Sequence, residues 1–339
     1  MRQIWITKPG DVSVLQIRES EHPVPGQDDV LIEVKAIGIN FADIMARIGM
    51  YFDAPPTPCV VGYEVSGIVE EVGAQVTNIK AGDRVMAITH FGGDTTKACV
   101  PSSQVWPMPP EMTFEEGAAL LVNYLTAYLA VFTVGNLKKG ERILVHSAGG
   151  GVGIAAIQLA KTLEVDIFGT ANKGKHEFLR GIGVREPIDY LSTDFSVAIL
   201  RLTDQKGVHL ILDPIGGASI KKDARLLAPL GRIIVYGISS SARKHRKSRL
   251  SLLSLLLSTP RFSPLGLQRH NHGIFGLYLG ALWEESGLLR GIMEHLKELW
   301  DAGAIRPRVA RAFAFEEVGK AHTYIQERRN IGKVVLRAG

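Results

Sequence analysis

Residues 141–170, ERILVHSAGGGVGIAAIQLAKTLEVDIFGT, decide the fold of this chain. The apolar run 143–145 is typical of a buried parallel strand. A glycine-rich turn follows it, then an apolar segment with the length of a helix, 154–163, and a second strand, 166–170. These parts form a βαβ unit. Because strand and helix patterns keep alternating to about residue 260, we expect an α/β fold with a doubly wound parallel sheet.

The glycine-rich turn predicts a dinucleotide site of the Rossmann type. Backbone N–H groups at the start of a helix bind a pyrophosphate, and glycines let that backbone approach it closely. The spacing is A-x-x-G-x-G rather than the usual G-x-G-x-x-G, and the alternative is an α/β turn that binds no nucleotide. The flanking strand and helix favour the nucleotide site. Its predicted contacts are Ala148, Gly150, Gly151, Val152 and Gly153.

The end of the second strand indicates which nicotinamide cofactor is used. A site for NAD places Asp or Glu there to bind the ribose 2′-hydroxyl. This strand instead ends at Thr170 and is followed by Lys173 and Lys175, while Asp166 stands at its start. A carboxylate would repel a 2′-phosphate and a lysine would attract it, so we expect NADPH, bound by Thr170, Lys173 and Lys175. The alternative is that both lysines are ordinary surface residues.

A chain of 339 residues is long for one domain, so we expect two. Ahead of the central motif, β-rich runs such as 30–38 and 65–73, with prolines between them, predict a compact, mostly β domain. A strand pattern near the end of the chain is expected to rejoin that domain. The predicted limits are 1–122 with 261–339 for the β domain and 123–260 for the dinucleotide-binding domain.

Composition excludes several classes of protein. The hydrophobic fraction of 46% supports a full core, yet no apolar run approaches the roughly 20 residues of a membrane span. The N-terminus lacks the apolar core of a signal peptide. Only Cys59 and Cys99 are present, so a disulfide framework is excluded and a reducing cytosol is expected.

The net charge of +5 arises from one local patch of basic residues. Five basic residues stand within 243–249, and without them the remaining charges cancel, so no nucleic-acid-binding face is expected. The patch begins the segment 243–257, RKHRKSRLSLLSLLL. A basic cluster beside leucines can lie in an anionic membrane interface. The alternative, which we favour, is a solvated basic loop ahead of leucines buried at the domain junction. The expected location is cytoplasmic, with peripheral membrane contact through 243–257 as the alternative.

Several motifs resemble a known family. The order of a β domain, a dinucleotide fold and a C-terminal return resembles the medium-chain dehydrogenase/reductase superfamily. The stretches GINFAD at 38–43 and GYE at 62–64 are similar to its zinc-free quinone oxidoreductase, or zeta-crystallin-like, branch. The stretches LVNYLTAY at 121–128 and DPIGG at 213–217 most resemble the vesicle amine transport protein subgroup. The resemblance implies a GroES-like fold for the β domain and a homodimer.

The resemblance also implies further site residues. It puts Asn40 and Tyr51 near the nicotinamide and the substrate, Thr126 and Gly237 at the nicotinamide half of the cofactor, and Tyr190 at its adenosine phosphate end. A tyrosine hydroxyl or an asparagine amide can hydrogen-bond a quinone oxygen as negative charge develops on it. The alternatives are that Asn40 is a turn residue and Tyr51 a loop aromatic. Asp43 and Arg47 could equally form a structural ion pair.

No metal site is expected. A catalytic zinc needs Cys and His side chains that converge on it. The position that resembles the family's metal-binding histidine is Tyr63, and the region of its first cysteine ligand is 40–43, which contains no cysteine.

These observations predict zinc-independent hydride transfer from NADPH to a quinone or a related conjugated carbonyl. Such a transfer needs proximity, orientation and a dry pocket more than an acid–base pair. One alternative is reduction of the C=C bond of an enone or alkenal. The other is an NADPH-binding protein that contacts lipids or membranes and turns over little.

Overall fold

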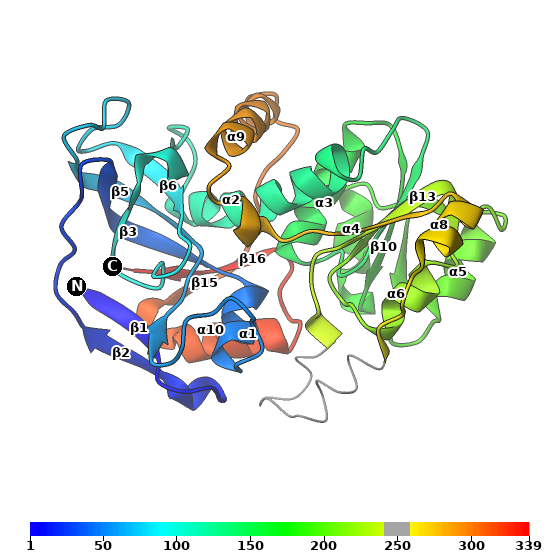
Figure 1. The fold of residues 1–339 in the computed structure, drawn as a ribbon, viewed down its shortest axis with the longest axis horizontal. Helices are drawn as coiled ribbons and strands as arrows, with labels where there is room; N and C mark the ends of the chain where they lie inside the picture. Colours follow the sequence, from blue (N-terminus) through cyan, green and yellow to red (C-terminus); the bar gives the residue numbers. More distant parts are fainter. Residues whose placement is uncertain (241–257, 339) are drawn as a thin grey trace.

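The computed structural model describes residues 1–240 and 258–338. Figure 1 shows a β-rich lobe that carries both termini and a second lobe built on a parallel sheet. Between them lies helix α2 (Phe114–Tyr128), which contacts strands of the first lobe and helix α3 (Gly151–Lys161) of the second. The predicted capping box starts α2: Thr113 accepts from the Glu116 N–H, and the Glu116 carboxylate accepts from the Thr113 N–H.

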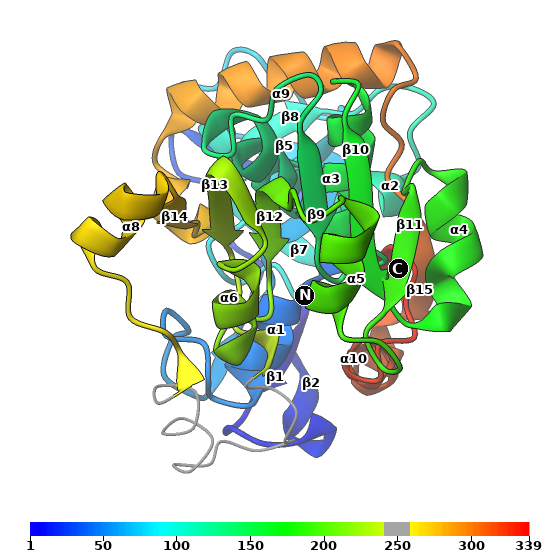
Figure 2. The ribbon, with the colours of Figure 1, turned by 90° about the vertical axis from the view of Figure 1, so that its right-hand side faces the viewer.

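The parallel sheet of the second lobe confirms the predicted doubly wound fold. Its order is β11-β10-β9-β12-β13-β14, every neighbouring pair is parallel, and the direction of winding reverses between β9 and β12. Figure 2 looks at this sheet with β11 at the right and β14 at the left. The strands are β9 (Arg142–Val145), β10 (Asp166–Ala171), β11 (Glu186–Asp189), β12 (Val208–Asp213), β13 (Leu227–Val235) and β14 (Gly273–Gly276). The dinucleotide-binding domain was expected to end at residue 260. Strand β14, which pairs with β13 in this sheet, begins after that limit, at Gly273.

Strand β9 shows why its sequence is apolar throughout. Successive side chains of a strand point to opposite faces. Ile143 and Val145 lie in the core cluster shared with α2 and α3, while Leu144 lies in the cluster on the other face. A central parallel strand buried on both faces therefore needs an unbroken apolar run. The helices that follow the next strands are α4 (His176–Gly181), α5 (Phe195–Leu202) and α6 (Ala218–Asp223).

The first lobe is mostly β, as expected for a GroES-like domain, and the C-terminal strand returns to it. In its larger sheet, ordered β15-β16-β3-β5-β6-β8, strand β16 is antiparallel to β3, and β7 pairs with β3 as well. The strands are β3 (Asp29–Ile39), β5 (Glu64–Val72), β6 (Arg84–Ile88), β7 (Lys97–Pro101), β8 (Val105–Pro107), β15 (Val309–Ala314) and β16 (Lys333–Arg337). Among the residues that the structure describes, the remaining α-helices are α1 (Phe41–Arg47), α8 (Pro264–His270), α9 (Ser286–Asp301) and α10 (Val318–Gln326).

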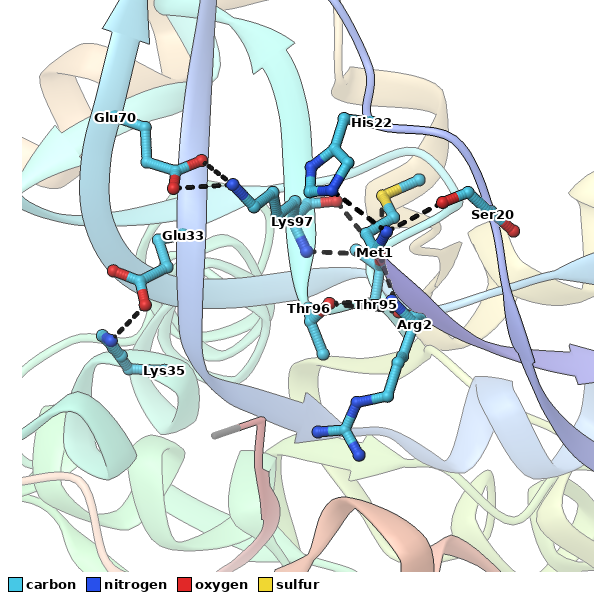
Figure 3. A network of polar contacts seen from close by, with 10 residues as sticks. All are labelled: Met1, Arg2, Ser20, His22, Glu33, Lys35, Glu70, Thr95, Thr96 and Lys97. Carbon is cyan, nitrogen blue, oxygen red and sulfur yellow. Dashed lines mark hydrogen bonds and ion pairs between the residues drawn. The ribbon is translucent and has the colours of Figure 1, made fainter.

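Polar contacts hold the N-terminus against this lobe (Figure 3). The small sheet β2-β1-β4 comprises β1 (Arg2–Ile6), β2 (Leu15–Glu19) and β4 (Cys59–Val60). The Met1 ammonium donates to the Ser20 carbonyl at 2.8 Å, and the Arg2 N–H donates to Thr96 Oγ1 at 3.0 Å. The first strand is thereby tied to the loop before β7.

One described helical segment, Phe114–Thr133, has the length and composition of a membrane span. It is 72% buried inside the fold, where it forms the core between the two lobes. A core helix of this kind is apolar because it packs on several sides. The segment 243–257, for which membrane contact was considered, lies outside the described residues.

Candidate active site

The structure gathers most of the predicted cofactor residues at one edge of the parallel sheet. The glycine turn follows β9, Lys173 and Lys175 follow β10, Tyr190 follows β11, and Gly237 follows β13. Because these strands are parallel, their carboxyl ends meet at the same edge, beside the point where the strand order reverses. Ligands of open α/β sheets bind in this position.

The glycine turn is closely packed and leads into an uncapped helix N-terminus, a cradle that would suit a pyrophosphate. Gly150 is the N-cap of α3 and no side chain caps it within the described residues, so the first N–H groups of the helix are available to an anion. A Cβ on Gly151 would lie 2.5 Å from Asn123 Nδ2, and one on Gly153 would lie 2.6 Å from the Ser147 carbonyl oxygen. Only glycine fits both positions. The residues present therefore suit a dinucleotide.

Lys175 lies directly on this turn. A Cβ on Gly149 would lie 2.6 Å from Lys175 Cδ, so glycine at that position makes room for the lysine stem. Lys175 Nζ donates to the Asn330 carbonyl at 2.5 Å. Burial, with the nearby Arg328 charge, lowers the pKa of Lys175 to about 8. Lys173 is exposed instead. Of the two predicted lysines, Lys175 is the one built into the edge of the cradle.

Arg328 is a cation of this region that the sequence did not single out. Its guanidinium donates to Tyr190 Oη at 3.0 Å and lies 5.5 Å from the centroid of that ring. It also acts electrostatically on Lys175, which places both charges near Tyr190. Two cations and a phenol form a surface suited to a phosphate. Arg328 follows helix α10 beside Arg329, a pattern that ordinary surface residues share.

Thr170 is placed differently from what its predicted role needs. Its side chain is buried, and Oγ1 lies 3.0 Å from His146 Nδ1. His146 in turn contacts Asp223 at 2.9 Å through Nε2. The hydroxyl therefore faces the interior of the domain, and contact with a 2′-phosphate, which stays a prediction, would require it to leave His146.

Asn40 is held in one orientation by two buried charges. Its Oδ1 accepts from Lys333 Nζ at 2.5 Å, and its Nδ2 donates to the carbonyl oxygen of Gly38 and to Glu64 Oε1 at 3.1 and 3.2 Å. Lys333 and Glu64 form an ion pair with side chains only 3% and 0% exposed. The second Glu64 oxygen accepts from the Val122 N–H of α2 at 3.0 Å. Asn40 is thus more than a turn residue: its amide belongs to a fixed polar network.

The start of β16 joins this network to the cofactor cradle. The Gly332 N–H donates to the Gly149 carbonyl at 3.0 Å, next to Lys333. Asn330, two residues earlier, accepts from Lys175. The segment 330–333 therefore touches both the glycine turn and the group around Asn40. Lys333 was not predicted as a site residue, because its position before an apolar strand gave no signal of its own.

Tyr51 lies in an aromatic cluster rather than alone on a loop. Its ring centroid is 5.8 Å from that of Tyr63 and 6.2 Å from that of Tyr278, and its hydroxyl lies 3.4 Å from the Tyr278 hydroxyl. Burial raises the pKa of Tyr51 above its ordinary value, so the phenol stays protonated near neutral pH. Its hydroxyl is available as a hydrogen-bond donor.

Asp43 connects the backbone around Asn40 to the segment that carries Tyr63. Its carboxylate accepts from the Asn40 N–H at 2.6 Å and from the Gly62 N–H at 3.1 Å. Complete burial raises the pKa of Asp43 to about 7. The ion pair considered between Asp43 and Arg47 is not formed: Arg47 donates to the carbonyl of Gly10 and to side chains of α10.

Thr126 and Gly237 remain predictions. Thr126 is buried on α2. Gly237 packs against the loop after β12, where a Cβ would lie 2.8 Å from the Pro214 carbonyl oxygen.

The residues described by the structure, 1–240 and 258–338, contain no group of three or more His, Cys, Asp or Glu side chains placed to hold a metal. Tyr63, at the position of the family's metal-binding histidine, is buried among aromatic rings.

Comparisons with known proteins agree with this architecture. The family profile described as "Alcohol dehydrogenase GroES-like domain" matches residues 26–110, and the one described as "Zinc-binding dehydrogenase" matches residues 182–336. The rat (Rattus norvegicus) "Synaptic vesicle membrane protein VAT-1 homolog" is 42% identical over 326 residues, which cover 96% of this chain and 80% of that protein.

Two solved structures share the whole fold. The Escherichia coli quinone oxidoreductase complexed with NADPH has a TM-score of 0.88 at 27% identity and covers 99% of this chain and 100% of its own. The CurK enoyl reductase has a TM-score of 0.85, also at 27% identity, with 99% and 98% covered. With the two-lobed fold and the identity to the VAT-1 homologue, they show that this chain belongs to the medium-chain dehydrogenase/reductase superfamily, in the branch of VAT-1 homologues and quinone oxidoreductase-like proteins.

Proposed function

We propose that this protein is an NADPH-dependent, zinc-independent oxidoreductase that reduces a quinone or a related conjugated carbonyl. The observation that carries the proposal is segment 330–333, which contacts the glycine turn, Lys175 and Asn40 together. A cofactor cradle and a polar acceptor site would thereby be held by one short piece of chain. The relation to an NADPH-bound quinone oxidoreductase supports the same cofactor.

Each predicted contact is assigned to one part of the cofactor or to the acceptor. Gly151, Val152 and Gly153 would bind the pyrophosphate with backbone N–H groups. Ala148 and Gly150, whose own N–H donates to the Ser147 carbonyl at 2.8 Å, would line the turn. Lys175, with Arg328 and Tyr190, would bind the 2′-phosphate. When bound, the reduced nicotinamide supplies a hydride. Asn40 and Tyr51 would orient the acceptor and donate hydrogen bonds to its oxygen as negative charge develops there.

Tyr51→Phe tests the acceptor side of this proposal. The variant keeps the ring and loses only the hydroxyl, so quinone turnover should fall about fivefold, the effect of roughly 1 kcal/mol in a half-buried site. The dissociation constant of NADPH should stay nearly unchanged. Steady-state kinetics with several quinones measures this: a lowered kcat indicates an interaction made in the transition state. Wild-type kinetics in the variant would show that the Tyr51 hydroxyl does not contribute to turnover and that the ring only packs against its neighbours.

Chelation tests the absence of a metal requirement. Exhaustive treatment with a chelator should leave NADPH oxidation unchanged, since the described residues offer no convergent set of zinc ligands. Elemental analysis should be run on the same samples. Stoichiometric zinc that is lost together with activity would contradict the proposal.

Two other functions rest on specific relatives. The similarity to an enoyl reductase supports reduction of a conjugated C=C bond. In that reaction the nicotinamide would still donate the hydride, and Asn40 and Tyr51 would still bind the carbonyl oxygen of the acceptor. The similarity to a protein named for the synaptic vesicle membrane supports an NADPH-binding protein that contacts lipids and turns over little. Tight binding of NADPH without oxidation by any quinone or enone would favour the latter.

We also propose a cytoplasmic homodimer. Among the described strands, β14 is the edge of the parallel sheet, and Phe275 on it is exposed. Helix α8 beside it has no buried residue. An exposed edge strand next to an uncovered helix can pair with a second copy of the chain. Peripheral membrane contact through 243–257 stays the alternative for the location.

A further inference from the structure

A line of hydrogen-bonding groups runs outward from Tyr51. The Tyr51 and Tyr278 hydroxyls are 3.4 Å apart, and the Tyr278 hydroxyl lies 2.6 Å from Asp53 Oδ2. The same carboxylate oxygen lies 3.2 Å from His90 Nε2. The four side chains come from three separate segments: the loop after α1, the connection after β14, and the loop after β6. Distant parts of the chain thus meet in one continuous polar path.

The path leads from a half-buried group to the surface. Tyr51 and Tyr278 are partly buried, whereas the Asp53 and His90 side chains are 36% and 56% exposed. Phe52 packs edge-on to Tyr278 with ring centroids 4.9 Å apart, and Phe91 lies beside His90 at 4.6 Å. One aromatic ring therefore packs against Tyr278 and another against His90, while the outer end of the path can exchange protons with water.

The proposed reduction consumes a proton, and this path can supply it from the surface. A hydride brings its electron pair to the acceptor, and the acceptor oxygen then needs one proton. Tyr51 can donate its own proton once, but a buried phenolate is costly and must be reprotonated before the next turnover. Burial already raises the pKa of Tyr51, which increases that cost.

We propose that Tyr278, Asp53 and His90 form a proton relay that reprotonates Tyr51; this inference rests on the proposed reductase function. The O–H bond of Tyr51 breaks as an O–H bond forms on the acceptor. Tyr278 passes its proton to Tyr51, Asp53 passes to Tyr278 a proton taken from His90, and His90 takes one from water. The acceptor gains one hydride and one proton, and every relay group returns to its starting state.

The geometry suits each transfer. In the resting arrangement Tyr51 donates to Tyr278 and Tyr278 donates to Asp53, so both hydroxyls rotate about their C–O bonds before a proton passes inward. The long contact of 3.4 Å leaves the Tyr51 hydroxyl free to turn toward an acceptor. Among the described residues, the other titratable groups that face this path are Asp43 and Tyr63, both acting on Tyr51. They lie on the inner side and offer no route to the surface.

Tyr278→Phe tests the relay, with Tyr128→Phe as the matched control. The control also loses a hydroxyl that contacts a histidine, His295 at 2.8 Å, but lies outside the path. We expect Tyr278→Phe to lower kcat about fivefold, to increase the solvent deuterium isotope effect, and to leave NADPH binding unchanged. His90→Gln should lower kcat and alter its pH profile, because the relay loses the side chain that takes protons from water. Tyr128→Phe should behave like the wild type.

A second readout needs neither cofactor nor turnover. The hydrogen bond from Tyr278, together with His90, lowers the pKa of Asp53. Tyr278→Phe should therefore raise the Asp53 pKa in the free protein, measured by carbon NMR of the carboxyl group. An unchanged Asp53 titration, or unchanged kcat, isotope effect and pH profile in an active enzyme, would overturn the relay and leave the reductase function intact. A wild-type protein that reduces no acceptor would refute the function, and the relay's catalytic role with it.

Discussion

NADPH is expected to bind a Lys175→Met, Arg328→Gln variant at least about a hundredfold more weakly than it binds the wild-type chain, while NADH binding changes little. Each lost cation would remove a charge-assisted hydrogen bond to the 2′-phosphate, worth about 1.5–3 kcal/mol. Methionine keeps a long stem on Gly149, where Lys175 Cδ packs. The loss should therefore reflect charge rather than a cavity. Calorimetric titration of the wild type and the double variant with both cofactors measures the effect.

Lys173→Ala is the matched control, since that lysine is exposed after the same strand. It should weaken NADPH binding by a few-fold at most.

The preference for NADPH should also depend on pH. In the free chain the Lys175 pKa of about 8 lies below that of an ordinary lysine, so above that pH the amine is largely neutral. Binding of a 2′-phosphate must then take up a proton. The preference for NADPH should therefore fall as pH rises through about 8. Equal losses for NADH and NADPH in the double variant would contradict the assignment.

Lys333→Met is expected to lower the free energy of unfolding by about 3–5 kcal/mol. The side chains of Lys333 and Glu64 are almost fully buried, so removal of one partner leaves the other charge without compensation in a medium of low polarity. Asn40 loses the donor to its Oδ1 at the same time. Denaturant unfolding followed by circular dichroism measures the loss, and turnover should fall with it because the amide is no longer oriented.

The double variant Lys333→Met, Glu64→Gln separates charge from packing. Glutamine keeps an oxygen for the Val122 N–H and carries no charge, so the double variant should recover a large part of the lost stability. Its turnover should stay low, because Asn40 still lacks its lysine. A single variant as stable as the wild type would show that the buried pair does not stabilise the fold.

Local patterns in the sequence predicted the fold because they reflect local physics. An apolar run buried on both faces, a glycine turn and a capping box each act within a few residues, and the strand β9, the cradle and helix α2 follow from them. The carboxyl edge of a parallel sheet then brings together most of the predicted cofactor residues without further information. The return of the last strand to the β lobe was expected from the strand pattern near the end of the chain, and strand β16 confirms it.

The polar networks could not be predicted in the same way. Asn40 and Lys333 are 293 positions apart, Tyr51 and Tyr278 are 227 apart, and Lys175 and Asn330 are 155 apart. Lysine before a strand or tyrosine after one has many ordinary explanations, and only the packed fold selects among them. The contact of Thr170 with His146 could not be predicted for a similar reason. Strand side chains alternate between the two faces of the sheet, and only the folded chain brings His146 next to the Thr170 hydroxyl.

One measurement tests the central claim most directly: oxidation of NADPH by the purified chain, followed together with reduction of the acceptor, across a panel of quinones and enones. We predict that at least one conjugated carbonyl is reduced, with one acceptor molecule consumed per NADPH, and that Tyr51→Phe slows this reaction without weakening NADPH binding. Tight NADPH binding with no oxidation above the uncatalysed rate for any acceptor would contradict the account and identify the protein as a binder of the cofactor rather than a reductase.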